Sequence, residues 1–356
     1  MKFYKKLGAA CLAAVMTLSF AGCSFSNTKW IARCGDLEIP VGVYLTGMLQ
    51  DYYNVMLMVG GNDKSVLNET GESGKTISEM IQETAKENVT STIALMSKAE
   101  EMGITLTEEE KKEIKDAVDA TWNQQGSLYE RNGIAKKSVE MLSQAAALSE
   151  KIFLALYGEG GEKAVPTEEV KTKYQEQYAK AGLFTFGKPE KSQVAENATE
   201  EEKQMAKEIE NTALTAAKSS ADEWMLRAKD ITTEEAFQNL VNEYKAAQGQ
   251  TVEEGQKIFG LVDLNNEQVP PEIITFLKDG PMNQPTLVET DTYFAIVYKA
   301  DPMADPADFE AMSTRILEEL KSEEFQEYIA QYAQGLEIEY NQKAIDKYLA
   351  EGITLG

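Results

Sequence analysis

Residues 285–298 read Pro-Thr-Leu-Val-Glu-Thr-Asp-Thr-Tyr-Phe-Ala-Ile-Val-Tyr. Two short runs rich in β-branched and aromatic residues flank a turn at Thr290-Asp291, and this pattern predicts two strands joined as a β-hairpin. Long stretches elsewhere, such as residues 76–102, carry apolar residues every three or four positions, which is typical of amphipathic helices. A hairpin among long helices predicts a predominantly helical α+β fold.

The same patterns predict the other elements. Residues 29–40 favour two short strands joined at Gly35-Asp36, and a helix that starts at Pro166 is expected to turn Tyr174, Tyr178 and Ala181 inward. A further strand is expected over residues 183–186. The other expected helices cover residues 41–58, 107–122, 135–156, 200–229, 234–247, 270–278, 308–333 and 342–350, with a last strand at 336–340. Candidate core residues of the 200–229 helix are Met205, Ile209, Leu214, Ala217 and Trp224.

The tripeptide Thr-Glu-Glu occurs at 107, 167, 199 and 233, each time before a helical pattern. A threonine hydroxyl caps the free N–H groups of a first helical turn, and glutamates there complement the helix dipole. Thr107 with Glu110 forms a capping box. These carboxylates could also bind a metal, but helix-start chemistry explains them better, and no EF-hand spacing is present.

The composition excludes several classes of protein. The 356 residues include no histidine, and 35 Lys+Arg against 59 Asp+Glu give a formal charge of −24. Histidine-dependent hydrolases, HExxH proteases and zinc fingers with histidine ligands are therefore excluded. The acidic surplus argues against nucleic acid as a partner. We expect no metal and no cofactor.

The N-terminus predicts an export signal. Three lysines within residues 1–6 precede the uncharged apolar run 7–20 and then Ala21-Gly22-Cys23. This segment resembles a bacterial lipobox, although Phe20 stands where leucine is usual. The resemblance implies cleavage after residue 22, diacylglycerol on Cys23 and a location on the outer face of the cell membrane, as in Gram-positive bacteria.

The order of elements resembles the PrsA and SurA foldases over nearly the whole mature chain. The matching stretches are Ile31–Ile39, Gly103–Glu110, Val165–Val170, Pro270–Gly280, Pro285–Thr290 and Asp308–Tyr348. The resemblance implies a tether at 23–28, a helical chaperone module at 29–165, a parvulin-type prolyl isomerase domain at 166–300, and a segment at 301–356 that returns to the chaperone module. It implies binding of unfolded secreted proteins and leaves a homodimer open.

The chain departs from parvulins where they keep a pair of histidines. The last-strand motif Gly-Tyr-His-Ile aligns with Thr292–Ala295, so Phe294 stands at the histidine position, and the first-strand histidine falls near Leu183 or Phe184. Phenylalanine cannot replace an imidazole hydrogen-bonding network. We therefore name no catalytic residue and expect a chaperone without efficient isomerase activity.

Three alternatives stay open. The first is an active prolyl isomerase with a histidine-free site, and the second is a solute-binding lipoprotein, which the long helices between 76 and 182 fit poorly. The third is a glycosidase with two carboxylates, for which 59 acidic residues offer no reasoned choice of pair. Tyr44, Tyr52, Tyr53, Met56 and Met58 cluster in the N-terminal module, where adaptable apolar side chains could bind clients or simply form core.

Overall fold

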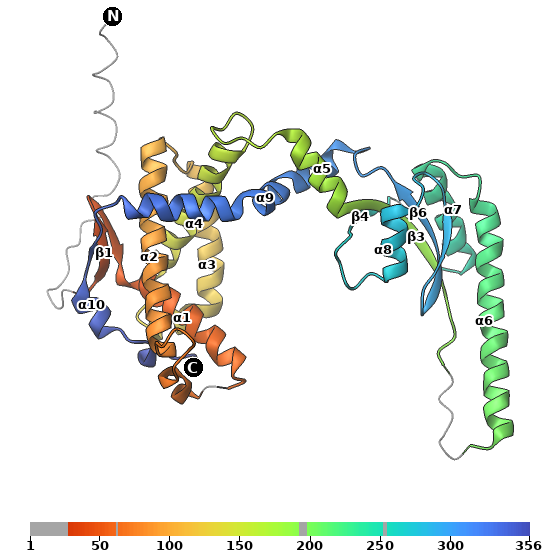
Figure 1. Ribbon diagram of the computed structural model, residues 1–356, viewed down its shortest axis with the longest axis horizontal. Helices are drawn as coiled ribbons and strands as arrows, with labels where there is room; N and C mark the ends of the chain where they lie inside the picture. The colour runs from red at the N-terminus through yellow and green to blue at the C-terminus, as the bar shows by residue number, and fades with distance from the viewer. Residues whose placement is uncertain (1–27, 62, 192–197, 252–254) are drawn as a thin grey trace, which may run out of the picture. The chain divides into compact units, whose positions relative to one another are not determined.

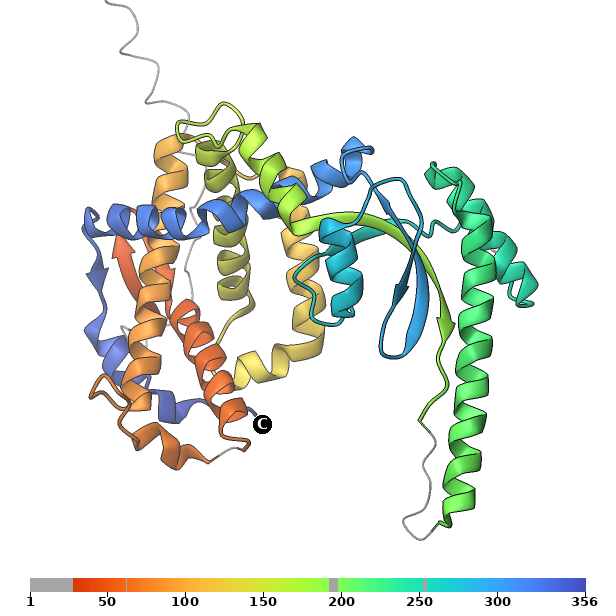
Figure 2. The same cartoon turned by 45° about the vertical axis from the view of Figure 1, so that its right-hand side comes forward.

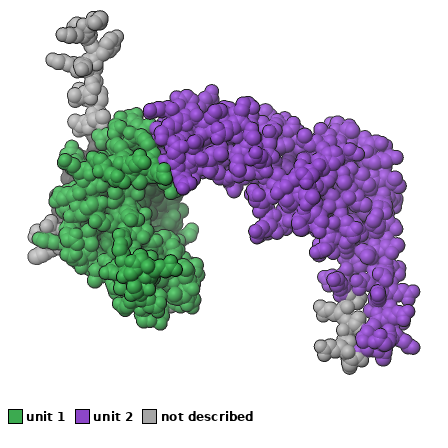
Figure 3. Space-filling view, in the orientation of Figure 1, with its two compact units in different colours: residues 1–152, 326–356 green, residues 153–325 purple. Residues whose placement is uncertain are grey.

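The computed structural model describes residues 28–61, 63–191, 198–251 and 255–356, and Cys23 lies outside these ranges. The predicted α+β fold with a majority of helix is confirmed. The chain divides into two compact units (Figure 3): Met1–Ile152 with Gln326–Gly356, and Phe153–Phe325. The N- and C-terminal segments thus form one unit, and the second unit is inserted between them.

The first unit combines a small antiparallel sheet, of strand order β2-β1-β7, with long helices (Figure 1). Its elements are β1 (Trp30–Cys34), β2 (Leu37–Pro40), α1 (Val41–Met58), the 3₁₀ turn η1 (Lys64–Asn68), α2 (Ile77–Met102), α3 (Glu108–Arg131), most of α4 (Lys136–Tyr157), the end of α9 (Pro306–Gln334), β7 (Glu339–Tyr340), α10 (Gln342–Lys347) and η2 (Ala350–Gly352). The core gathers buried residues from β1, α1 and α2.

Asparagine side chains tie the C-terminal segment to the rest of this unit. Asn341 Nδ2 donates to the carbonyl of Trp30 at 3.0 Å. Asn132 Nδ2 donates to the carbonyl of Thr354 at 2.8 Å, and the Thr354 N–H donates to Asn132 Oδ1 at 2.9 Å. Because Asn132 and Asn341 are buried, losing either pairing would leave polar atoms unsatisfied in the core.

Capping chemistry fixes three of the four helix starts that the Thr-Glu-Glu tripeptides predict. Thr107 and Thr199 form complete capping boxes, and the Thr233 hydroxyl accepts from the N–H of Ala236. A helix does start at the fourth tripeptide, but the predicted capping role of Thr167 is wrong: Pro166 occupies the N-cap position without a side-chain bond, so Thr167 is already the first helical residue.

The second unit is built on a four-stranded antiparallel sheet of order β4-β3-β6-β5. In Figures 1 and 2, α8 lies on one side of this sheet and α6 with α7 on the other. The elements are α5 (Thr167–Gln177), β3 (Tyr178–Gly187), α6 (Glu200–Ala228), α7 (Glu234–Ala247), β4 (Gly260–Asp263), α8 (Pro271–Asp279), β5 (Thr286–Glu289) and β6 (Tyr293–Ala300), with the start of α9.

Alternation along the strands sorts residues between two cores. Phe184, Phe186, Phe294 and Ile296 pack with residues of α6 and α7, including Trp224. Ala179, Ala181, Ala295 and Val297 pack with residues of α8, including Phe276. Successive residues of a strand point to opposite faces, so the apolar residues of both central strands contribute to both cores.

Several expected elements differ in this unit. Tyr178 and Ala181 belong to β3 rather than to the preceding helix, because strand pairing, of Tyr178 with β4 and of Ala181 with both β4 and β6, outweighs the local helical spacing. Met205 and Ile209, expected in the core, are 65% and 63% exposed, because the first half of α6 makes no core contact. Leu214 is also exposed, whereas Trp224 is buried as expected.

Candidate functional site

Phe294, which the sequence resemblance aligns with a parvulin histidine, lies in the sheet of the second unit. It belongs to the central strand β6, directly opposite Phe186 of β3, and is only 2% exposed. Its side chain faces α6 and α7. A substrate cannot reach this ring without displacing the helices that cover it.

The strand register decides which β3 residue can share a site with Phe294. Phe184 lies opposite Ile296 and packs in the same core as Phe294. Leu183 lies opposite Val297, which packs on the α8 side, so Leu183 faces away from Phe294. Of the two candidate positions, Phe184 alone occupies the face of Phe294.

Aromatic rings fill the space around Phe184 on the face of the sheet that Phe294 shares. The Phe184 ring lies 5.6 Å from Phe186, 5.9 Å from Phe237 and 4.8 Å from Tyr244, measured between centroids. Trp224 meets Tyr244 edge-on at 5.2 Å. This geometry is that of a packed core.

The polar groups at the margin of this cluster are already engaged. The Tyr244 hydroxyl donates to the carbonyl of Thr185 at 2.9 Å, and the Tyr298 hydroxyl pairs with Asn283 Oδ1 at 3.3 Å. Burial raises the pKa of both phenols above the ordinary value. Neither can act as a base at neutral pH.

A lysine lies over the Phe294 ring. Lys188 Nζ lies 4.8 Å from the ring centroid and donates to Glu289 Oε1 at 2.7 Å and to the carbonyl of Thr290 at 2.6 Å. The ammonium is therefore held by a carboxylate, a carbonyl and the face of a ring. It stabilises the β5–β6 hairpin next to Phe294.

The first unit carries an exposed apolar surface at the end of α1, which we call the α1 apolar tip and define as Tyr53, Leu57, Met58 and Val59. Leu57 is 67% and Met58 86% exposed. The helix ends at Met58, and Val59 is followed by Gly60, which has a positive φ of 70°, and by a second glycine. Four large apolar side chains thus meet water within seven positions.

The cluster of tyrosines and methionines seen in the sequence divides between core and surface. Tyr44, Tyr52 and Met56 are buried, whereas Tyr53 and Met58 are exposed. The sequence spacing indicates two neighbouring helix faces. Tyr53 and Leu57 are four residues apart and share one face, and Tyr52 and Met56 share the next. What the sequence could not show is which of the two faces the rest of the unit covers.

A partly buried carboxylate lies two residues before Tyr53. Asp51 Oδ2 is inaccessible to water and has no hydrogen-bond partner within the described part of the chain. Burial raises the pKa of this carboxyl above its usual value. The charge is thus kept at a cost to the stability of the first unit.

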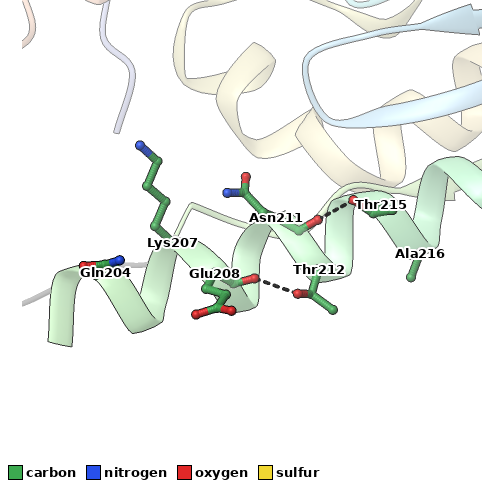
Figure 4. A pocket seen from close by; sticks show the side chains of 7 residues that line it. All are labelled: Gln204, Lys207, Glu208, Asn211, Thr212, Thr215 and Ala216. Carbon is green, nitrogen blue, oxygen red and sulfur yellow. Dashed lines mark hydrogen bonds between the residues drawn. The ribbon is translucent and has the colours of Figure 1, made fainter. Parts of the chain in front are cut away.

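The two best-defined hollows of the described ranges are lined neither by Phe294 nor by residues of the α1 apolar tip. A hollow along α6 is lined by seven residues of that one helix, and Figure 4 shows the Thr212 and Thr215 hydroxyls donating to the carbonyls of Glu208 and Asn211. Over the same ranges, no group of three or more Cys, Asp or Glu side chains is placed to hold a metal ion. No described helix is long and apolar enough to cross a membrane.

Comparisons with known proteins give only distant structural likeness. No family model and no curated protein sequence matches the chain. A structure of the foldase PrsA from Lactococcus lactis is 12% identical, with a TM-score of 0.36 over 92% of this chain and 100% of the other.

Two further PrsA structures give similar values. The one from Streptococcus pneumoniae is 14% identical, with a TM-score of 0.34 over 75% of this chain and 92% of the other. The one from Bacillus subtilis is 14% identical, with a TM-score of 0.30 over 80% and 98%. Likeness at these values does not identify a function, so the proposals below rest on the residues of this chain.

Proposed function

We propose that this protein is an extracytoplasmic, lipid-anchored chaperone that binds unfolded secreted polypeptides and has no efficient prolyl isomerase activity. The observation that carries the proposal is the α1 apolar tip. Exposed Leu57 and Met58 offer flexible apolar contacts next to a fully formed core, which suits weak binding of varied apolar segments.

The aromatic core around Phe294 supports the proposed lack of efficient prolyl isomerase activity. Rotation about a prolyl imide bond has a barrier of about 18–20 kcal/mol, and an enzyme can lower this barrier only by contact with the twisted bond. Buried Phe184 and Phe294 stand where the resemblance puts the paired histidines, beneath α6 and α7. An active isomerase would need a different and accessible site.

The remaining parts of the proposal concern placement in the cell. Cys23 would receive the lipid after removal of residues 1–22, residues 23–28 would serve as a tether, and the chain would remain at the outer face of the membrane. We assign client binding to residues 29–165 with 301–356, and a parvulin-like role without catalysis to 166–300. A homodimer is compatible with this assignment.

The main experiment measures suppression of aggregation of a chemically unfolded protein. The variant Leu57→Ser/Met58→Ser should lose most of the protective effect, because it removes the apolar contacts of the tip. The matched control Met205→Ser/Ile209→Ser removes two side chains of similar exposure from α6 and should protect like the unmodified protein. Equal protection by all three would refute the role of the tip.

Two further measurements separate the other parts of the proposal. Turnover of a proline-containing peptide at a rate typical of enzymes would refute catalytic silence. Cys23→Ala should abolish incorporation of labelled fatty acid and release the protein from cells into the medium. If the variant still carried lipid, the assignment of Cys23 would be wrong.

A further inference from the structure

The outer side of β3 is only partly paired. Strand β4 pairs with Tyr178–Ala181 and ends there, because its first residue Gly260 lies opposite Ala181. Strand β6 pairs with the whole length from Lys180 to Gly187 on the other side. Within the described part of the chain, no strand pairs with Gly182–Gly187 on the side of β4.

Three hydrogen bonds establish which backbone groups point to this side. The Gln177 carbonyl accepts from the N–H of Leu264 next to β4, and the Thr185 carbonyl accepts from the Tyr244 hydroxyl. The Lys188 N–H donates to the carbonyl of Thr292 on the opposite side, next to β6. Because backbone groups alternate along a strand, those of Leu183, Thr185 and Gly187 point away from β6.

Contacts with α7 and with Gly182 keep the residues before β4 away from the unpaired edge of β3. The N–H of Ile258 donates to Gln238 Oε1 on α7 at 2.9 Å. The Phe259 ring packs against Gly182, where a Cβ atom would lie only 3.1 Å from the ring. These contacts draw residues 258–259 towards α7, so β4 cannot extend along Leu183–Gly187.

The side chains along the open edge suit an extended partner. Leu183 is 37% exposed, and Thr185 and Gly187 are also exposed. None of the three carries a charge or a proline, which are the usual devices that prevent pairing at an edge. Leu183 offers one apolar contact, and the backbone offers the N–H groups of three residues.

We propose that Gly182–Gly187 binds an extended segment of an unfolded client by adding it to the sheet as an antiparallel strand. The proposal rests on the client-binding function above and adds a second binding site to it, within residues 166–300. Main-chain hydrogen bonds do not depend on sequence, and alternate side chains of the client would contact Leu183. This mode suits a protein that must accept many different polypeptides.

Thr185→Pro tests the proposed hydrogen bonds between β3 and the client strand and should leave the sheet itself intact. The Thr185 N–H points away from β6, so a proline there removes a bond only to a partner outside the sheet. We expect this variant to bind a reduced, carboxymethylated globular protein about tenfold more weakly, since a lost bond of about 1.4 kcal/mol changes affinity tenfold. Thr185→Val keeps the N–H and should bind as the unmodified protein does.

Amide hydrogen exchange in the unmodified protein gives an independent readout. Saturation with the unfolded probe should slow exchange of the Leu183, Thr185 and Gly187 amides about tenfold or more, while those of Phe184 and Phe186, already paired with β6, should not change. Protection of the three amides before the probe is added would show that the chain itself covers the edge and would overturn the proposal.

Other outcomes separate the two proposals. If the probe binds and the binding depends on the α1 apolar tip, but the three amides remain unprotected, strand addition is wrong and the chaperone function stands. If the unmodified protein binds no unfolded probe, both proposals fail. If Thr185→Val weakens binding as much as Thr185→Pro, the side chain rather than the N–H group is responsible, and the ladder is refuted.

Discussion

Placing a histidine at position 294 tests whether the aromatic core can still serve as an isomerase site. The Phe294→His variant puts an imidazole among apolar side chains, with Lys188 Nζ 4.8 Å from the centre of the present ring. The smaller apolar surface should cost about 1–2 kcal/mol. An imidazole nitrogen without a partner adds about 1–3 kcal/mol. The unfolding free energy at pH 7 should thus fall by about 2–5 kcal/mol.

The loss should grow in acid. Burial and the nearby ammonium both disfavour the imidazolium, so the folded-state pKa of this histidine lies below its unfolded value of about 6.5. The unfolded chain then binds the proton more readily, and stability relative to the unmodified protein declines as the pH falls below about 6.5. The slope is at most about 1.4 kcal/mol per pH unit.

Urea unfolding followed by the fluorescence of Trp224, in a Trp30→Phe/Trp122→Phe background, reports on this core because Trp224 packs in it. The control Phe294→Leu should cost about 1–2 kcal/mol and add no dependence on pH. A Phe294→His protein as stable as its parent from pH 5 to 8 would refute the closed core. Gain of isomerase activity would show that the site is accessible.

The other predictions concern the first unit. Asp51→Asn should raise the melting temperature at pH 7. Burial raises the folded-state pKa of Asp51, so the contribution of this carboxyl to stability declines as the pH rises from about 4. Thermal melts of the variant at increasing pH should lack that decline. Thr107→Ala should lower the unfolding free energy by about 1 kcal/mol in urea titrations, because it removes the N-cap of α3; an unchanged midpoint would contradict the cap. Hydrogen bonds from Lys151 and from the backbone N–H of Thr107 lower the pKa of Glu110 to about 2, so its stabilisation is lost as the pH falls from about 4.3 towards 2. Glu110→Gln should remove that part of the acid unfolding curve, and a curve of unchanged shape would refute the assignment.

Local signals in the sequence predicted the elements that depend on neighbouring residues. The helix over Val41–Met58 has the predicted bounds, and the capping box of Thr107 with Glu110 forms as expected. The hairpin of Thr286–Glu289 with the strand from Tyr293 is also present. Each rests on periodicity, turn residues or caps within a few positions of one another.

Elements that depend on distant partners were not predictable in this way. Strand β4 has four residues and exists because it pairs with Tyr178–Ala181, some 80 positions earlier. The exposure of Met205 and Ile209 depends on how far α6 extends beyond the sheet, which their spacing does not encode. For the candidate site, the sequence identified Phe294, but only the register showed that Phe184 shares its face.

The aromatic contact between Phe153 and Phe325, with ring centroids 5.4 Å apart, bears on the order in which the protein is completed. These two residues are the ends of the inserted unit, so its folding brings the two separate segments of the first unit together. Trp30 and Asn341, which bond across 311 positions, would otherwise have to meet through a much longer loop. Shortening that loop lowers the entropic free-energy cost of closing it by on the order of 0.5–1 kcal/mol. During synthesis the insert is complete before residue 339 emerges, so β1 can pair with β7 only late, because β7 is the last strand of its sheet to be made.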